Sequence, residues 1–296
     1  MKFLPILFLL FAGLSACSPA AESAAADSEP GTSDTHRIVS LSGTLTELLY
    51  DLDFGDQLVG VDVTSTYPSA VNDVPKLGHV SQLNVEGLLA LHPTLVFVAE
   101  EAKDKPALET LADAGVTVVP VTMYPTLDNA ARAATVLARH LSIDEQKIAE
   151  YTAGIEKDKR ELEEKLAANE GERPRVLFIY ARGAKQLMVA GTDTEAAAII
   201  ELAGGENAIQ SFSDFKPLTP EALVEAAPEF ILMFTSGLAS LDGKAGLANI
   251  PGISQTPAFQ HDQIIAMDGH YLLGFGPRAA QAAGDLAGKL HNRISK

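Results

Sequence analysis

Short apolar runs alternate with segments of helical periodicity from residue 37 onward. A β-branched run at 37–41 is followed by residues 42–50, whose apolar positions recur at helical spacing, with Gly43 in the turn between them. The alternation predicts further strands at 57–62, 94–98 and 116–121 and helices at 85–91 and 106–114. Strands that alternate with helices pair in parallel and are covered by helices on both faces. Because the pattern restarts with a strand at 175–180, a helix at 194–202 and a strand at 229–234, it predicts two α/β lobes.

A polar, charged segment separates the two halves of this pattern. Residues 143–169 combine strong helix formers with opposite charges three and four residues apart, and only Gly154 weakens the helix. We expect one long helix, since about 25 residues at 1.5 Å each would reach roughly 38 Å, about the width of a lobe. A coiled-coil arm is the alternative, but its apolar seam would consist of only Ile148, Tyr151, Ile155, Leu162 and Leu166. A rigid strut between the lobes is therefore preferred.

The start of the chain has the pattern of an export signal. Lys2 precedes an apolar run of about 11 residues and small residues, whereas a membrane-spanning helix needs roughly 20 apolar residues. Cys17, at the end of this segment, is the only cysteine of the chain, so an intrachain disulfide is excluded. Residues 18–36 contain almost no side chain suited to a core, and we expect them to form a flexible tether.

Composition restricts the function further. The formal charge of -17 argues against nucleic acid as a partner, because such partners reward clustered Lys and Arg. The sequence contains no nucleophile elbow, phosphate-binding loop, zinc-protease helix or Cys-His pair, so an enzyme is not expected. The expected domains are a leader at 1–17, the tether at 18–36, lobes at 37–142 and 171–296, and the linking helix at 143–170.

Several motifs, in this order, resemble those of a known transport family. The segment Leu14-Ser15-Ala16-Cys17 resembles a bacterial lipobox, whose cysteine carries the lipid anchor of the mature protein. Residues 37–296 resemble class III substrate-binding proteins of ABC importers, which carry vitamin B12, ferric siderophores or haem. The marks are Thr46-Glu47-Leu48, Val59-Gly60-Val61-Asp62, Thr66-Tyr67-Pro68, Leu77-Gly78, residues 85–96, Ala203-Gly204-Gly205-Glu206-Asn207 and residues 273–278.

The resemblance implies a fold, a location and partners. It implies two Rossmann-like lobes joined by a single long helix, in a monomer held outside the cytoplasm by lipid on Cys17, at the cell surface or in the periplasm. ABC permease and ATPase subunits would be its partners. Within the class the motifs look most like the haem-binding branch, and the low aromatic content of 6% fits a siderophore pocket less well. A ferric siderophore or a corrinoid remains the alternative cargo, and a chelatase-like enzyme is a more distant one.

Haem capture requires an iron ligand facing the cleft and cations for the propionates. His79 follows Gly78 at the place where the haem branch commonly has a tyrosine ligand; it departs from that pattern but is a competent ligand. Tyr180 ends a strand of the second lobe, where side chains reach a ligand crevice, and Arg182 beside it would favour the phenolate that ferric iron prefers. His79 and Tyr180 are therefore the expected iron ligands.

Other residues have alternative roles in the same scheme. Tyr67 is a wall or propionate contact or packs its own turn, Arg278 has a propionate or a structural role, and Tyr271 and His270 are competing cleft residues. Glu86 and Glu221 each open a predicted helix, where a carboxylate complements the helix dipole. In the family, glutamates at these matched places dock onto arginines of the permease, so both are expected docking residues.

Overall fold

The computed structural model describes residues 36–168 and 171–291. The predicted signal peptide, Cys17 and all of the predicted tether except His36 lie outside the described residues. Within the described ranges, no helix has both the length and the apolar character that crossing a membrane requires.

The first lobe is built on a four-stranded parallel sheet, as predicted. Its strand order is β2-β1-β3-β4 and every neighbouring pair is parallel. In chain order the elements are β1 (Ile38–Ser40), α1 (Gly43–Asp51), β2 (Leu58–Val61), α2 (Val85–Leu89), β3 (Leu95–Ala99), α3 (Pro106–Asp113) and β4 (Thr117–Val121). Successive residues of β3 face opposite sides of the sheet. Phe97 packs into the hydrophobic core that includes α1, and Val98 packs into the core that includes α2 and α3. Both faces of the sheet are therefore buried.

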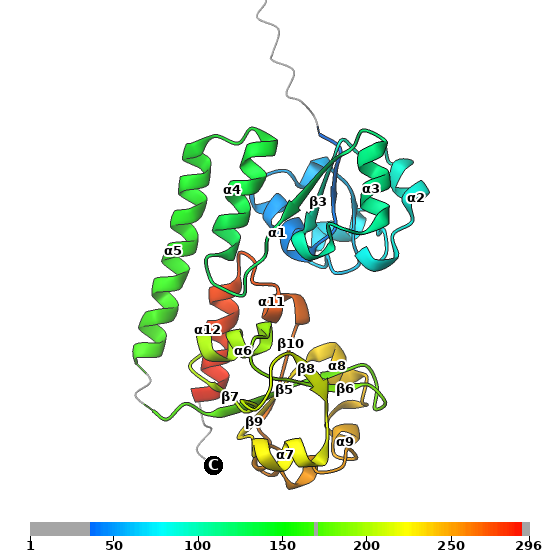
Figure 1. Cartoon of the computed structure of the whole chain (residues 1–296). Coiled ribbons are helices and arrows are strands. Elements are labelled where there is room, and N and C mark those ends of the chain that lie inside the picture. The colour runs from blue at the N-terminus through cyan, green and yellow to red at the C-terminus, as the bar shows by residue number, and fades with distance from the viewer. Residues whose placement is uncertain (1–35, 169–170, 292–296) are drawn as a thin grey trace, which may run out of the picture. The chain divides into compact units, whose positions relative to one another are not determined.

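The predicted linking helix is α5 (Glu145–Ala167), which begins at an Asp144 cap accepting a hydrogen bond from Lys147 N at 2.8 Å. Ile148, Tyr151 and Ile155 pack into the core of the first lobe, and Leu162 and Leu166 pack into a core of the second. The five residues of the hypothetical coiled-coil seam are thus used within the chain. Helix α4 (Asn129–Leu141), which the sequence pattern did not predict, lies between α1 and α5 (Figure 1).

The second lobe has a mixed sheet of order β10-β9-β5-β6-β8, with β7 also paired to β5. Its elements are β5 (Arg175–Ala181), β6 (Leu187–Ala190), α6 (Glu195–Leu202), β7 (Glu206–Asn207), β8 (Phe215–Pro217), α7 (Pro220–Ala226), β9 (Phe230–Phe234), α8 (Thr235–Ala239), α9 (Gly243–Leu247), α10 (Pro257–Gln260), β10 (Ile264–Met267), α11 (Gly269–Leu273) and α12 (Ala279–His291). The parallel pairing expected from the sequence holds for β5, β7, β9 and β10.

Strands β6 and β8 instead run antiparallel to their neighbours. For β6 the reason lies in the connection from β5, where Arg182 N donates to Gln186 O at 3.0 Å and Gly183 has a φ of 71°. So tight a turn can only reverse the chain, because a parallel crossover needs a dozen or more residues. The sequence pattern at 175–180 predicted the strand but not this hairpin.

Each sheet has a proline-containing strand at one edge. Pro120 lies in β4 and Pro217 in β8, and both strands are last in their sheets. Proline has no N–H to donate, so it is tolerated where a strand needs partners on one side only. The two prolines are thus consistent with these strands ending the sheets.

Candidate ligand-binding site

His79 lies on a loop that follows the carboxyl end of β2. Leu77 N donates to Val61 O at 2.8 Å and Val63 N donates to Gly78 O at 3.1 Å, so this loop is fastened to the strand. Gly78 has a φ of 85°, a conformation that glycine adopts without strain and that turns the chain just before His79. The expected loop position of His79 is therefore confirmed, and its side chain is exposed.

The ring of His79 is oriented by a neighbouring serine. Its Nδ1 lies 2.8 Å from Ser81 Oγ and 3.2 Å from Ser81 N. A metal-binding histidine usually donates its other ring N–H to an acceptor. Here Ser81 N donates to Nδ1, so Nδ1 accepts and the proton of the neutral ring lies on Nε2. Binding of a metal through Nε2 would require this proton to move to Nδ1, where Ser81 Oγ lies within reach to accept it.

Tyr180 lies in β5, opposite Met188 of the antiparallel β6. It shares a core face with Phe178, whereas Ile179 and Ala181 enter the core on the other side of the sheet. The ring of Phe234, at the end of β9, meets the Tyr180 ring edge-on with centroids 6.0 Å apart. Tyr180 is therefore a partly buried residue of a hairpin strand rather than of a loop leading into a helix.

Arg182 comes two residues after Tyr180 and projects from the same side of the hairpin. Its guanidinium carbon lies 5.7 Å from the centre of the Tyr180 ring, and the arginine is otherwise exposed. The structure thus brings Tyr180 and Arg182 together. Among the described residues, no hydrogen bond or ring contact links either of them to His79.

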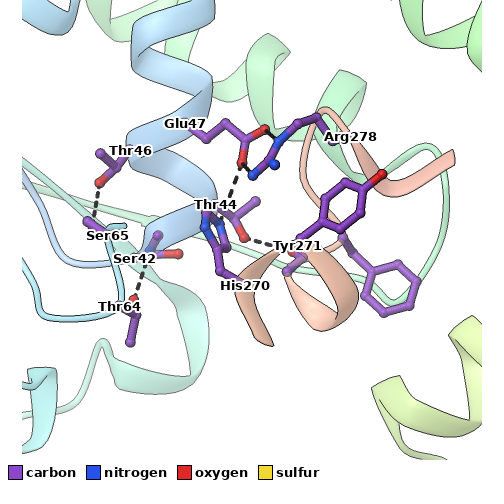
Figure 2. A network of polar contacts seen from close by, with 12 residues as sticks. Ser42, Thr44, Thr46, Glu47, Thr64, Ser65, His270, Tyr271 and Arg278 are labelled. Atoms are coloured by element: carbon purple, nitrogen blue, oxygen red, sulfur yellow. Dashed lines mark hydrogen bonds and ion pairs between the residues drawn. The ribbon is translucent and has the colours of Figure 1, made fainter. Parts of the chain in front are cut away.

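Arg278 is bound to a carboxylate of the first lobe. Its Nε donates to Glu47 Oε1 at 2.5 Å and its Nη2 donates to Oε2 at 2.9 Å, forming a bidentate pair between α1 and the segment before α12 (Figure 2). Glu47 is 3% exposed. Burial acts against the charge of Arg278, but the hydrogen bonds and charge of Glu47 raise the pKa of Arg278. These contacts with Glu47 support a structural role for Arg278.

Two tyrosines cover the same guanidinium. The Arg278 Cζ lies 3.6 Å from the centre of the Tyr67 ring and 4.9 Å from that of Tyr271. Tyr67 comes from the loop after β2, is 42% exposed and precedes a cis proline. Tyr271 donates its phenol proton to Asp285 Oδ2 at 2.9 Å, and burial together with this bond raises the pKa of Tyr271. Tyr271 is therefore held as a neutral phenol and is a poor competitor for ferric iron.

His270 lies beside Glu47 in the same network, as Figure 2 shows. Its Nε2 is 3.6 Å from Glu47 Oε2, its side chain is 10% exposed, and neither ring nitrogen has a hydrogen-bond partner. Burial lowers the pKa of His270, in opposition to the charge of Glu47, which raises it. The imidazole is thus kept neutral next to an ion pair.

Two further hydrogen bonds join the lobes near this pair. Thr44 Oγ1 donates to Gly274 O at 2.7 Å, and Asn129 Nδ2 donates to Phe275 O at 2.9 Å. The sequence analysis gave no role to Thr44, Glu47 or Asn129. The signal for Glu47 was present, because a carboxylate within the apolar sequence of α1 has to be paired if it is buried.

Glu86 and Glu221 occupy equivalent places in the two lobes. Each lies in the first turn of its helix and is exposed, as predicted. Both helices have side-chain caps: Gly87 N donates to Asn84 Oδ1 at 3.2 Å, and Ala222 N donates to Thr219 Oγ1 at 3.1 Å. The dipole explanation for the two glutamates is therefore sound, and their docking role stays a prediction.

A groove of about 360 Å³ lies elsewhere, between α5, α11 and α12. It is lined by residues that include Asp158, Leu162, Lys165, Tyr271, Gln281 and Asp285. Neither His79 nor Tyr180 borders it. Within the described residues, no cluster of three or more His, Cys, Asp or Glu side chains is arranged to hold a metal ion.

The family model for periplasmic binding proteins matches residues 38–271 of this chain. The chain belongs to the periplasmic binding protein family. Two solved structures with closely similar folds are the haem-binding protein RhuT from Roseiflexus sp. RS-1 in its apo form and the haem-binding protein BhuT in complex with two haems. RhuT is 37% identical with a TM-score of 0.83. BhuT is 35% identical with a TM-score of 0.82, and in each case 87% of this chain and 98% of the other chain are covered.

Other relatives broaden the range of named ligands. The ABC transporter substrate-binding lipoprotein YvrC of Bacillus subtilis is 26% identical over 86% of this chain and 80% of its own length. A cobalamin-binding protein of Halobacterium salinarum is 26% identical over 90% of this chain and 71% of its own length. Two structures of the haem-binding protein HmuT, each with a TM-score of 0.77, carry alanine in place of a tyrosine or a histidine. The tyrosine variant is 26% identical, and the match covers 87% of this chain and 81% of the HmuT chain. The histidine variant is 27% identical, and the match covers 88% of this chain and 86% of the HmuT chain.

Proposed function

We propose that this chain is the extracytoplasmic haem-binding component of an ABC importer, which receives haem between its lobes and delivers it to the permease. The observation that carries this proposal is the similarity of nearly the whole described chain to structures of haem-binding proteins at 35–37% identity. No bond of the cargo is broken in this role, so the chain would act as a receptor and not as an enzyme.

His79 and Tyr180 are the proposed iron ligands, one from each lobe. Ser81 Oγ, 2.8 Å from Nδ1, supports this role because it can accept the Nδ1 proton of the tautomer that binds a metal through Nε2. Arg182 supports the role of Tyr180, since a cation near the ring stabilises a phenolate bound to ferric iron.

Tyr67 and Arg278 complete the proposed site in different ways. Tyr67 is exposed enough to form a wall for a porphyrin or to meet a propionate. Arg278 is already occupied by Glu47, so its contribution to the propionates would be through its charge alone, while its contacts hold the lobes together.

Delivery would follow from docking of the two lobes on the permease. We assign this contact to Glu86 and Glu221, and we assign Cys17 to the lipid anchor that keeps the receptor at the membrane. If docking separates the lobes, it also separates His79 from Tyr180, and each ligand alone would retain the iron poorly.

The absorbance spectrum during titration with hemin tests the proposed ligands. We expect a Soret band for the purified protein, and a shift of that band with weaker binding for His79→Ala and for Tyr180→Phe. Each loss of a ligand should raise the hemin dissociation constant by roughly ten- to a hundredfold, the range typical of altered metal sites. His261→Ala and Tyr124→Phe are the matched controls, since both residues are exposed and outside the proposed site.

A corrinoid is the second candidate cargo, because the cobalamin-binding relative matches over 90% of this chain. Calorimetric titration with cyanocobalamin separates the two. Tight binding of cyanocobalamin together with indifference to hemin would replace haem by a corrinoid in the same receptor role.

A further inference from the structure

The ion pair between Glu47 and Arg278 lies at one end of a continuous series of contacts that leads to Tyr180. Glu47 belongs to α1 of the first lobe, and Arg278 follows α11 of the second. Thr44, one turn before Glu47, holds the last carbonyl of the α11 segment through its bond to Gly274 O at 2.7 Å. These bonds together fix α11 against α1.

Helix α11 in turn packs against Phe234. Gly269 is its first residue, and a Cβ placed there would lie 3.4 Å from the Phe234 ring, so the ring rests on the helix start. Met267, two residues before Gly269, is paired with Phe234 across strands β10 and β9. A displacement of α11 would therefore be felt directly by the Phe234 ring.

The Phe234 ring then meets Tyr180. The two rings are 6.0 Å apart at 88°, and Phe178 supports Phe234 from the other side at 5.1 Å and 71°. Edge-to-face pairs of this kind have restricted geometry, and close-packed neighbours transmit displacement rather than absorb it. The series runs from Glu47 through α11 and Phe234 to the phenol.

We infer that Glu47 is a positioning residue for Tyr180, acting through Arg278, α11 and Phe234 and never touching the cargo. Glu47 holds the second lobe's α11 at one place on the first lobe, and this sets the position from which the phenol approaches the cleft. The role of Tyr180 toward iron rests on the proposed function, but the mechanical link does not require it.

The variants are chosen to break this link at separate places. Glu47→Gln removes the charge and keeps the shape, Arg278→Lys keeps the charge and removes the bidentate geometry, and Thr44→Val removes only the bond to Gly274 O. Lys147→Met is the matched control, because it breaks an ion pair with Asp53 at 2.8 Å that does not involve α11. If Glu47→Gln fails to fold, as judged by circular dichroism, the two milder variants carry the test.

Fluorine NMR of the apo protein labelled with 3-fluorotyrosine gives the first readout. The chain has six tyrosines, and their signals are assigned by single Tyr→Phe changes. We expect the Tyr180 signal to shift or broaden in Glu47→Gln, Arg278→Lys and Thr44→Val and to stay unchanged in Lys147→Met. If only Tyr67 and Tyr271, which touch Arg278 directly, respond while Tyr180 does not, the inference is overturned.

Hemin titration gives the second readout. For Glu47→Gln we expect a Soret band displaced toward that of Tyr180→Phe and a dissociation constant raised by roughly tenfold, as for other residues that orient a ligand. A wild-type protein that ignores hemin would reject the proposed function, and the fluorine signals would still decide the positioning role. If wild type binds hemin and all three variants bind it equally well, the positioning role is rejected and the proposed function is not.

Discussion

Glu47 and His270 show how much of the contact between the lobes depends on single buried polar side chains. Removing one partner of a buried ion pair leaves an uncompensated charge, which typically costs about 3–5 kcal/mol. His270 adds a different constraint, because its two ring nitrogens have no hydrogen-bond partner. A neutral imidazole tolerates that position far better than a charged one.

This constraint predicts a pH dependence of stability. Because burial lowers the pKa of His270 in the folded protein, the unfolded chain takes up the proton first as the pH falls. The stability due to neutral His270 is complete above its ordinary value of 6.5 and is lost as the pH falls below it. We expect the melting temperature of wild type to drop between pH 7 and pH 5 more steeply than that of His270→Gln.

The groups around His270 determine how this test is read. Glu47 and Asp268 favour the protonated ring, as does Asp62 from the loop after β2, whereas Arg278 opposes it. Comparison of the two melting curves cancels titrations shared by both proteins. Parallel curves for wild type and His270→Gln would show that His270 does not titrate in this window.

At the scale of elements, α5 connects the lobes by contributing side chains to both cores. It is polar along most of its length, and only Ile155 and Leu162 are fully buried. Its formation therefore depends on helix propensity and on its cap more than a core helix does.

Gly154, in the middle of α5, gives a direct test. A Cβ there would meet nothing within 4 Å, so Gly154→Ala adds helix propensity without a clash. We expect the free energy of unfolding to rise by about 0.5–1 kcal/mol, measured by urea denaturation. Gly43→Ala is the contrasting case, because its Cβ would lie 2.6 Å from Thr64 O, and it should lose about 1–3 kcal/mol. A loss in both variants would contradict the role given to helix propensity.

The elements also show what a sequence pattern can and cannot predict. Most strands with runs of β-branched residues and several helices, including the long one, were located because these features are local, whereas the helices α4 and α12 were not predicted. The antiparallel β6 depends on a turn at Gly183 whose geometry the composition did not reveal. The bond between Glu47 and Arg278 joins residues 231 positions apart, and no local pattern encodes such a distance.

The candidate site also combines features that the local sequence predicts with features that only the folded chain shows. The loop position of His79 followed from the chemistry around Gly78, and the adjacency of Tyr180 and Arg182 followed from their spacing along one strand. The stacking of Tyr67 and Tyr271 on Arg278 combines three distant segments. It could be recognised only once the lobes were placed together.

At the scale of the whole molecule, the proposed docking residues are distinct from the proposed iron ligands. Glu86 and Glu221 are exposed at the starts of helices in different lobes, and neither contacts His79 or Tyr180 through a hydrogen bond in the described part of the chain. A partner that engages both could therefore act on the lobes without competing for the cargo.

The combined variant Glu86→Gln with Glu221→Gln tests this separation. We expect hemin uptake by cells that depend on this receptor to fall at least about tenfold, because two charged contacts are lost, while the hemin dissociation constant stays the same. Glu109→Gln with Glu225→Gln is the matched control, since it removes two exposed charges from the same lobes. Weaker hemin binding in the first variant would reject the docking assignment.

The prolines at the sheet edges have a consequence for contact between copies of this chain. An exposed strand offers unpaired N–H and C=O groups to which another copy could add its own strand. Pro120 and Pro217 interrupt that row of donors, and Lys216 beside the second adds a charge that a neighbouring strand would have to bury. These two strand edges are thus poor templates for the addition of a strand from another copy of the chain.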